Sequence, residues 1–171
     1  AAALGLVAAG ILYGSRTAAA SDPSGYVSQS ALWARGPLRV DQRFASTLPW
    51  PNASQSLTPL GYRVAADGAM VPTYAPGVPL LMALGRQVGA CGPYLVGPIC
   101  GALLVLFTFQ LGRPVFGAAA ATIAAILVAC SPVVVFMSLV PMADVPAATF
   151  WVGGLALAVG GSGPRAFPPG G

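Results

Sequence analysis

Four aspartates are the side chains best suited to act as a general base in this chain: Asp22, Asp41, Asp67 and Asp144. The chain has no Glu, Lys or His, so it cannot form a Ser-His-Asp triad, a His-ligated metal site, a P-loop or a lysine Schiff base. A perturbed Cys or Tyr is the other source of a base near neutral pH. The ionisable residues therefore favour chemistry in which a carboxylate moves a proton.

Two of these aspartates precede a proline at the start of a predicted helix. Asp22 is followed directly by Pro23, and Asp144 stands two residues before Pro146. An Asp before a helix that begins with proline is typical of an N-cap, so capping is one interpretation of both residues. Catalysis is the other interpretation of Asp22, because it ends an apolar run and shares a helix face with Tyr26, four residues further on.

Other polar and aromatic residues before position 93 have weaker signals. Asp41 and Asp67 are expected to be solvated or turn residues. Arg63 has two interpretations, a bidentate contact with a phosphate or a solvated loop arginine. Four aromatic residues could either stack on sugar rings or anchor the chain at a membrane interface: Tyr26, Trp33, Trp50 and Tyr74.

The elements that must position these residues are those of a membrane protein. The chain has 171 residues, of which 56% are hydrophobic and 7% are charged, whereas soluble domains have about 25% charged residues. Its mean hydropathy is +0.77, and a helix needs about 20 apolar residues to cross a bilayer. The predicted segments are the end of a first span (1–14), a long outer loop with short interfacial helices (15–92), a second span (93–112), a third span (115–136), a second outer loop (137–144), a fourth span (145–161) and a cytoplasmic linker (162–171).

The apolar start has a second interpretation, a signal peptide, because residues 17–21 offer a small-residue cleavage site. The missing basic n-region and the later spans favour a membrane span instead.

The arginines set the predicted orientation. Arg113 lies in the short turn between the second and third spans, and Arg165 follows the fourth, so the positive-inside rule places both in the cytoplasm. The long loop with Asp22, and the loop that ends at Asp144, then face outward. The net charge of +4 comes from scattered arginines, so no nucleic acid partner is expected.

Three stretches, taken together, resemble the GT-C membrane glycosyltransferases, the superfamily of protein O-mannosyltransferases and lipid A aminoarabinose transferases. They are "SDPSGYVSQSALW" (21–33), "VPTYAPGVPLLMALG" (71–85) and "PMADVPAATFW" (141–151). In that superfamily the first outer loop carries an essential Asp, often as Asp-Glu-x-x-Tyr. Asp22 and Tyr26 match the ends of this pattern, whereas Pro23 replaces the Glu. The element from Tyr74 to Gly77 is similar to the Tyr-Pro-Pro-Gly of the family, and Asp144 is the acid of the second outer loop.

The resemblance implies an all-α membrane protein, a GT-C-like bundle with about four transmembrane helices. It implies an enzyme that moves a sugar from a polyprenyl-phosphate donor to a hydroxyl of a lipid, glycan or protein on the outer face of the membrane. Asp22 would be the catalytic base, and Tyr26, Arg63, Tyr74 and Asp144 would bind substrate. No cofactor is predicted, and a need for a divalent metal ion stays open. The expected location is a bacterial inner membrane among membrane lipids, with the site facing the periplasm or exterior.

Two alternatives stay open, a transporter or channel fragment and a non-catalytic membrane scaffold. Transporters usually place ionisable groups inside their spans, and the predicted complete spans carry no interior charge. The small-residue run "GAAAATIAA" (117–125) would serve helix packing in an enzyme and in a scaffold alike. We also expect this sequence to be the N-terminal part of a longer transferase, cut at both ends and inactive alone, in which further spans follow residue 171.

Overall fold

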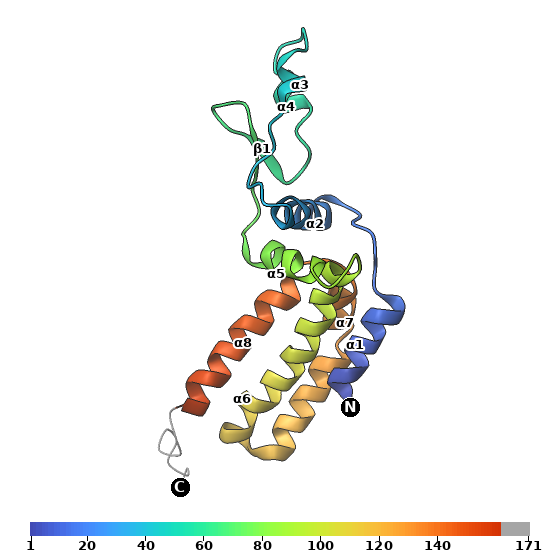
Figure 1. Cartoon of the computed structure of the whole chain (residues 1–171). Coiled ribbons are helices and arrows are strands. Elements are labelled where there is room, and N and C mark those ends of the chain that lie inside the picture. Colours follow the sequence, from blue (N-terminus) through green and yellow to red (C-terminus); the bar gives the residue numbers. More distant parts are fainter. Residues whose placement is uncertain (162–171) are drawn as a thin grey trace. The chain divides into compact units, whose positions relative to one another are not determined.

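The computed structural model describes residues 1–161 and divides the chain into two compact units (Figure 1). The first unit contains residues 1–15 and the described residues from 95 onward, and the second contains residues 16–94. Most of the described residues are helical, which agrees with the predicted fold class. Arg165, which was expected to face the cytoplasm, lies outside the described residues.

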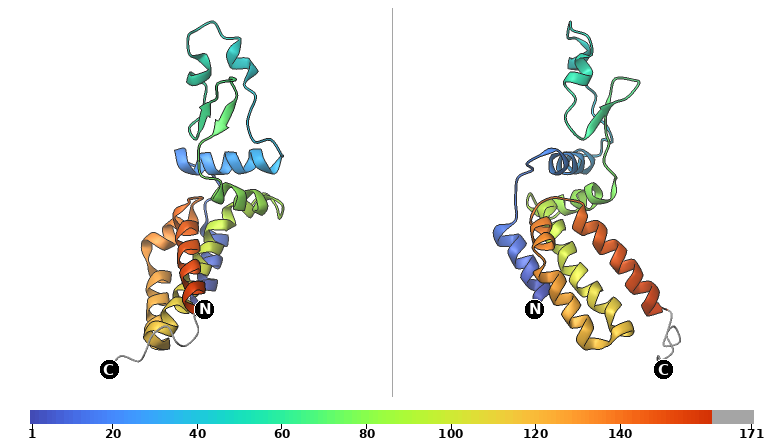
Figure 2. Two further views of the ribbon diagram at one scale, coloured as in Figure 1. Left: turned by 90° about the vertical axis from the view of Figure 1, so that its left-hand side faces the viewer. Right: turned by 180° about the vertical axis from the view of Figure 1, so that it is seen from behind.

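The first unit contains α1 (Ala2–Tyr13), most of α6 (Gly92–Cys130), α7 (Pro132–Leu139) and α8 (Asp144–Gly161). The chain reverses inside α6 at Gly117, whose φ of 82° and ψ of 168° are not helical. A Cβ added at Gly112 would lie 3.2 Å from the Cβ of Ala121, whereas nine residues of straight helix span about 13.5 Å. Residues 92–116 and 118–130 therefore form two arms of a helical hairpin (Figures 1 and 2).

This reversal differs from the predicted turn at Arg113, because the first arm continues helically through Arg113 and Pro114. The predicted third span (115–136) is also interrupted, since the second arm ends at Cys130 and α7 starts anew at Pro132. Ser131, at the break, has an extended backbone (φ −63°, ψ 120°). Proline at the first position of α7 fits a helix start, where its missing N–H costs no hydrogen bond.

The core of the first unit joins α1 to both arms of α6. Leu6, Val105 and Ala125 are buried together. Glycines let the backbones approach closely: a Cβ on Gly10 would lie 2.1 Å from the ring of Pro98. The hydroxyl of Thr149 in α8 donates to the carbonyl of Cys100 at 2.8 Å. Small residues and hydroxyl contacts of this kind are typical of helices that pack in a membrane.

Among residues 1–161, one helix, α6, is long and apolar enough to cross a membrane by its length and composition. This helix is the one that folds back at Gly117. A second such element exists if α7 and α8, which are bent by 116°, count as one span. The helices α1 and α5 are apolar but shorter. The number of four transmembrane helices thus stays a prediction.

The second unit contains α2 (Ser21–Ala34), α3 (Arg43–Ser46), α4 (Ala53–Ser56), β1 (Tyr62–Val64), β2 (Met70–Pro72) and α5 (Gly77–Arg86). The strands β1 and β2 form an antiparallel hairpin in which Arg63 pairs with Val71. Val40 adds an isolated bridge to Met70. The prediction of a loop with short helices missed this hairpin, because its strands are only three residues long and strand patterns need about four residues to be recognised.

Candidate active site

The helix α2 carries a glycine in its interior where a helix normally avoids one. Gly25 is buried, as are Pro23, Gln29 and Ser30. Glycine inside a helix costs about 1 kcal/mol relative to Ala, so its presence calls for a packing reason. The reason is the ring of Tyr74: a Cβ added at Gly25 would lie 2.1 Å from it.

A second glycine packs against the same edge of the Tyr74 ring. A Cβ at Gly61 would lie 2.6 Å from the same ring, and Gly61 has a φ of +88°, a conformation that strongly favours glycine. The Nε2 of Gln29 donates to the backbone carbonyl of Tyr74 at 3.3 Å. Tyr26 packs against Tyr74 with ring centroids 4.7 Å apart. The tyrosine ring is therefore fixed in place by α2 and by the turn before β1.

The fixed ring aims its hydroxyl at the carboxylate of Asp22. The Oη of Tyr74 donates to Oδ1 of Asp22 at 2.6 Å, and the Oγ of Ser21 donates to the same oxygen at 3.3 Å. The hydrogen bond to Asp22, followed by desolvation and the negative charge of that residue, raises the pKa of Tyr74. Tyr74 thus stays protonated, as a donor, throughout the physiological range.

The expectation that Asp22 caps its helix is wrong. The helix begins at Ser21, its N-cap residue is Ala20, and no side chain caps it. Asp22 lies inside the first turn, where a negative charge interacts favourably with the helix dipole, but its oxygen is engaged with Tyr74. Ala20 has φ 70° and ψ 174°, a region that is essentially reserved for glycine, and such strain clusters at functional sites.

Arg86, which sequence reasoning missed, holds α5 to α2. The Nε of Arg86 donates to Oγ of Ser30 at 3.1 Å, and its second guanidinium nitrogen donates to the carbonyl of Val27, also at 3.1 Å. The signal for Gln29 and Arg86 was weak, because each is a common surface residue in an amphipathic helix. Gly25 was the better clue, since a helix interior does not suit glycine without a close neighbour.

Two other predicted site residues belong to different units, Arg63 to the second and Asp144 to the first. Arg63 is exposed on β1. Asp144 belongs to the other unit, where it is exposed in the first turn of α8. Asp41 pairs with Arg43 at 2.8 Å on an exposed surface, and Asp67 pairs with Arg39 in the hairpin turn. The backbone N–H of Ala69, with help from Arg39, holds the pKa of Asp67 below its ordinary value.

The cluster has the chemistry of a proton acceptor rather than of a metal centre. In the part of the chain from 1 to 161, no group of three or more His, Cys, Asp or Glu side chains gathers to hold an ion. Both hydrogen bonds to Asp22 end on Oδ1, so Oδ2 can take up a proton without breaking them. A carboxylate oriented in this way suits the deprotonation of a hydroxyl group.

A family profile described as dolichyl-phosphate-mannose-protein mannosyltransferase matches residues 72–159, more than half of the chain. The chain therefore belongs to this family of glycosyltransferases. The matched range includes Tyr74 and Asp144, whereas Asp22 and Tyr26 precede it. A comparison with curated proteins and one with solved structures each found no match.

Proposed function

We propose that this protein transfers a sugar from a polyprenyl-phosphate donor to an acceptor hydroxyl on the outer face of the membrane. The family implies a lipid-linked donor and an acceptor in general terms. The observation that carries the finer proposal is the 2.6 Å hydrogen bond by which Tyr74 orients Asp22. A carboxylate fixed by a neutral donor keeps its capacity to accept a proton.

The proposed step moves one sugar and one proton. The acceptor oxygen attacks the anomeric carbon of the donor sugar and forms the new glycosidic bond. The bond between that carbon and the phosphate oxygen breaks, and the polyprenyl phosphate leaves with the electron pair. Oδ2 of Asp22 takes the proton from the acceptor hydroxyl, and solvent later removes it.

Tyr74 has a different role in this proposal from the one that the sequence suggested. One edge of its ring packs against Gly25 and Gly61, and the ring also contacts Tyr26. Its hydroxyl is engaged with Asp22. Tyr74 is therefore a positioning residue that acts through the carboxylate. Tyr26 remains a substrate-contact proposal, as do Arg63 for the donor phosphate and Asp144 for donor or acceptor.

The donor class is tested by supplying two labelled substrates to membranes that contain the full-length protein. Mannosyl-phosphate polyprenol should label an acceptor directly. GDP-mannose should do so only where a separate enzyme first converts it to the lipid-linked form, so purified protein in liposomes should not use it. Direct use of GDP-mannose by the purified protein would contradict the proposal. A transporter or a scaffold would transfer no sugar from either donor.

A further inference from the structure

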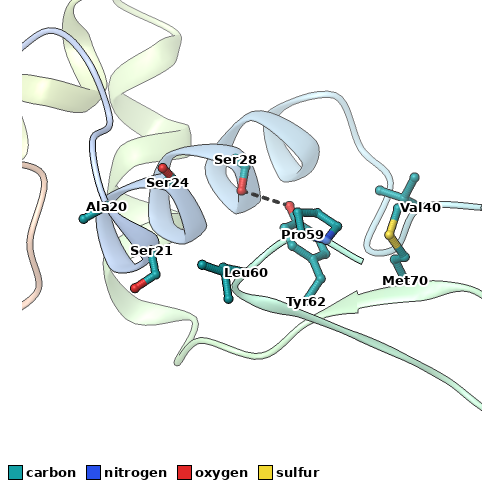
Figure 3. Close-up of a pocket in the computed structure, with 9 residues that line it drawn as sticks. All are labelled: Ala20, Ser21, Ser24, Ser28, Val40, Pro59, Leu60, Tyr62 and Met70. Carbon is teal, nitrogen blue, oxygen red and sulfur yellow. Dashed lines mark hydrogen bonds between the residues drawn. The ribbon is translucent and has the colours of Figure 1, made fainter. Parts of the chain in front are cut away.

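The second unit contains a cavity of about 470 Å³ beside α2 (Figure 3). Its volume falls in the range of about 300–1,000 Å³ that is usual for small-molecule sites. One wall is α2, and the opposite wall is formed by the segment around Val40 and by residues 59–70. Ser21 lines the cavity and donates to the carboxylate of Asp22. Asp22 is not itself a lining residue, so Ser21 is the link between the cavity and the proposed base.

The α2 wall presents a row of hydroxyl oxygens. Ser21, Ser24 and Ser28 line it, and their spacing of three and four residues places them on one helix face. Their protons are already used: Ser24 donates to the carbonyl of Ala18, and Ser28 donates to that of Gly25. A hydroxyl has one proton and two lone pairs, so these serines can offer lone pairs to a ligand. A ligand that donates hydrogen bonds therefore suits this wall without displacing the bonds that the serines already make.

The facing wall is apolar and includes an aromatic ring. Leu60, Tyr62 and Met70 line it, and Figure 3 shows Leu60 and Tyr62 between the strand and α2. The hydroxyl of Tyr62 donates to Ser28 at 3.2 Å and fixes the ring across the cavity. The cavity therefore has hydroxyl acceptors on one side and an apolar, aromatic surface on the other. A pyranose ring suits both sides, because its hydroxyls can donate hydrogen bonds and its C–H groups can pack on an aromatic ring.

The described residues that line the cavity carry no charge. A phosphate or carboxylate placed there would meet no cationic side chain and a mostly apolar surface, and burying an unpaired charge is costly. The sugar of the donor carries a phosphate at its reacting carbon, so it fits this environment poorly. A sugar that enters without a phosphate fits it well.

We propose that this cavity binds a neutral sugar unit of the acceptor and presents one of its hydroxyls to Asp22. The inference rests on the proposed function and specifies its acceptor as a neutral glycan or glycolipid. A phosphorylated sugar would be rejected for lack of a cationic side chain, and a hydroxyl on a peptide would use the cavity only in part.

The direct test is binding, which does not depend on activity. Saturation-transfer NMR is measured with the purified full-length protein in nanodiscs, with methyl α-mannopyranoside as the neutral probe and mannose 6-phosphate as the anionic one. Leu60→Trp fills the cavity, and Leu60 is 72% exposed, so the variant should fold. Leu38→Trp is the matched control, because Leu38 is equally exposed and lies outside the cavity lining. We expect the neutral probe to bind wild type and Leu38→Trp, and Leu60→Trp to lose most of the signal.

Kinetic measurements then show whether the sugar that binds in the cavity belongs to the acceptor or to the donor. Leu60→Trp should raise the KM for a neutral glycoside acceptor, octyl α-mannoside, by about tenfold, the equivalent of one or two net hydrogen bonds. The KM for the lipid-linked donor should stay unchanged. A raised donor KM, equal binding of mannose 6-phosphate, or a threonine-containing peptide as the better cavity-dependent acceptor would overturn the inference. If wild type binds the neutral probe in the cavity but transfers no sugar, the proposed function fails and the binding site stands.

Discussion

In the proposed reaction, the hydrogen bond from Tyr74 decides which oxygen of Asp22 takes up the proton. It ends on Oδ1 at 2.6 Å, and the donor ring packs along one edge against Gly25 and Gly61. A base that must meet a substrate hydroxyl within about 3 Å depends on such fixed orientation. The contact between Tyr74 and Asp22 is therefore better support for the proposed base than the presence of either residue alone.

Tyr74→Phe should lower the rate of sugar transfer by about tenfold, which is less than the loss of about 10²–10⁴-fold expected when a catalytic base is removed. Phe keeps the ring against the two glycines and removes only the donor. The loss should appear in kcat more than in KM, and it is measured by steady-state transfer in membranes.

The dependence of stability on pH gives a second readout of the bond between Tyr74 and Asp22, which a merely space-filling ring would not change. The pKa of Tyr74 is raised, so its stabilising bond is complete below the ordinary tyrosine pKa of about 10. That contribution is lost as the pH rises through the raised value. Thermal stability of wild type should therefore fall more steeply above pH 10 than that of Tyr74→Phe, and equal slopes would argue against the bond.

At the scale of the elements, α2 is shaped to receive Tyr74. Gly25→Ala should destabilise the second unit by about 1–3 kcal/mol, the usual cost of overpacking, because the new Cβ would meet the ring at 2.1 Å. Gly77→Ala is the control, since a Cβ there has open space within 4 Å. Thermal unfolding in detergent checks both variants. A silent Gly25→Ala would mean that Tyr74 does not pack there.

The pairing of α2 and α5 depends on a forked contact. Arg86→Lys should cost about 1–2 kcal/mol, because an ammonium cannot reach both Ser30 and the Val27 carbonyl as a guanidinium does. Arg43→Lys is the matched control, since the Arg43 side chain is 90% exposed and such changes stay within about 0.5 kcal/mol. If the two variants are equally stable, the contacts of Arg86 do not hold α5 to α2.

The sequence predicted those elements whose signals lie within a short stretch of neighbouring residues. The apolar helices and the helix after Asp22 follow from hydropathy and spacing, which are local. The reversal at Gly117 was expected four residues earlier, because Arg113 and Pro114 look like a turn although proline is tolerated near a helix end. The contact between Asp22 and Tyr74 joins residues 52 positions apart, and local patterns carry no information about such a pair.

At the scale of the whole molecule, the proposed function requires the second unit to face outward. With Cys91, Cys100 and Cys130 replaced, a single cysteine at position 63 should react with an impermeant maleimide in intact cells. One at position 113 should react only after lysis, because arginines in short connections favour the cytoplasm. Labelling of 113 but not 63 in intact cells would place the second unit in the cytoplasm and contradict a site on the outer face.

The most direct test of the account is Asp22→Asn in the full-length protein, compared with Asp41→Asn. Asn keeps an oxygen that can accept the hydrogen bond from Tyr74 and removes only the capacity to take up a proton. Transfer of labelled mannose from a polyprenyl-phosphate donor, normalised to folded protein, should fall by about 10²–10⁴-fold for Asp22→Asn. It should stay at the wild-type level for Asp41→Asn, whose carboxylate lies on an exposed surface. A fully active Asp22→Asn protein would contradict the central claim that this carboxylate is the base.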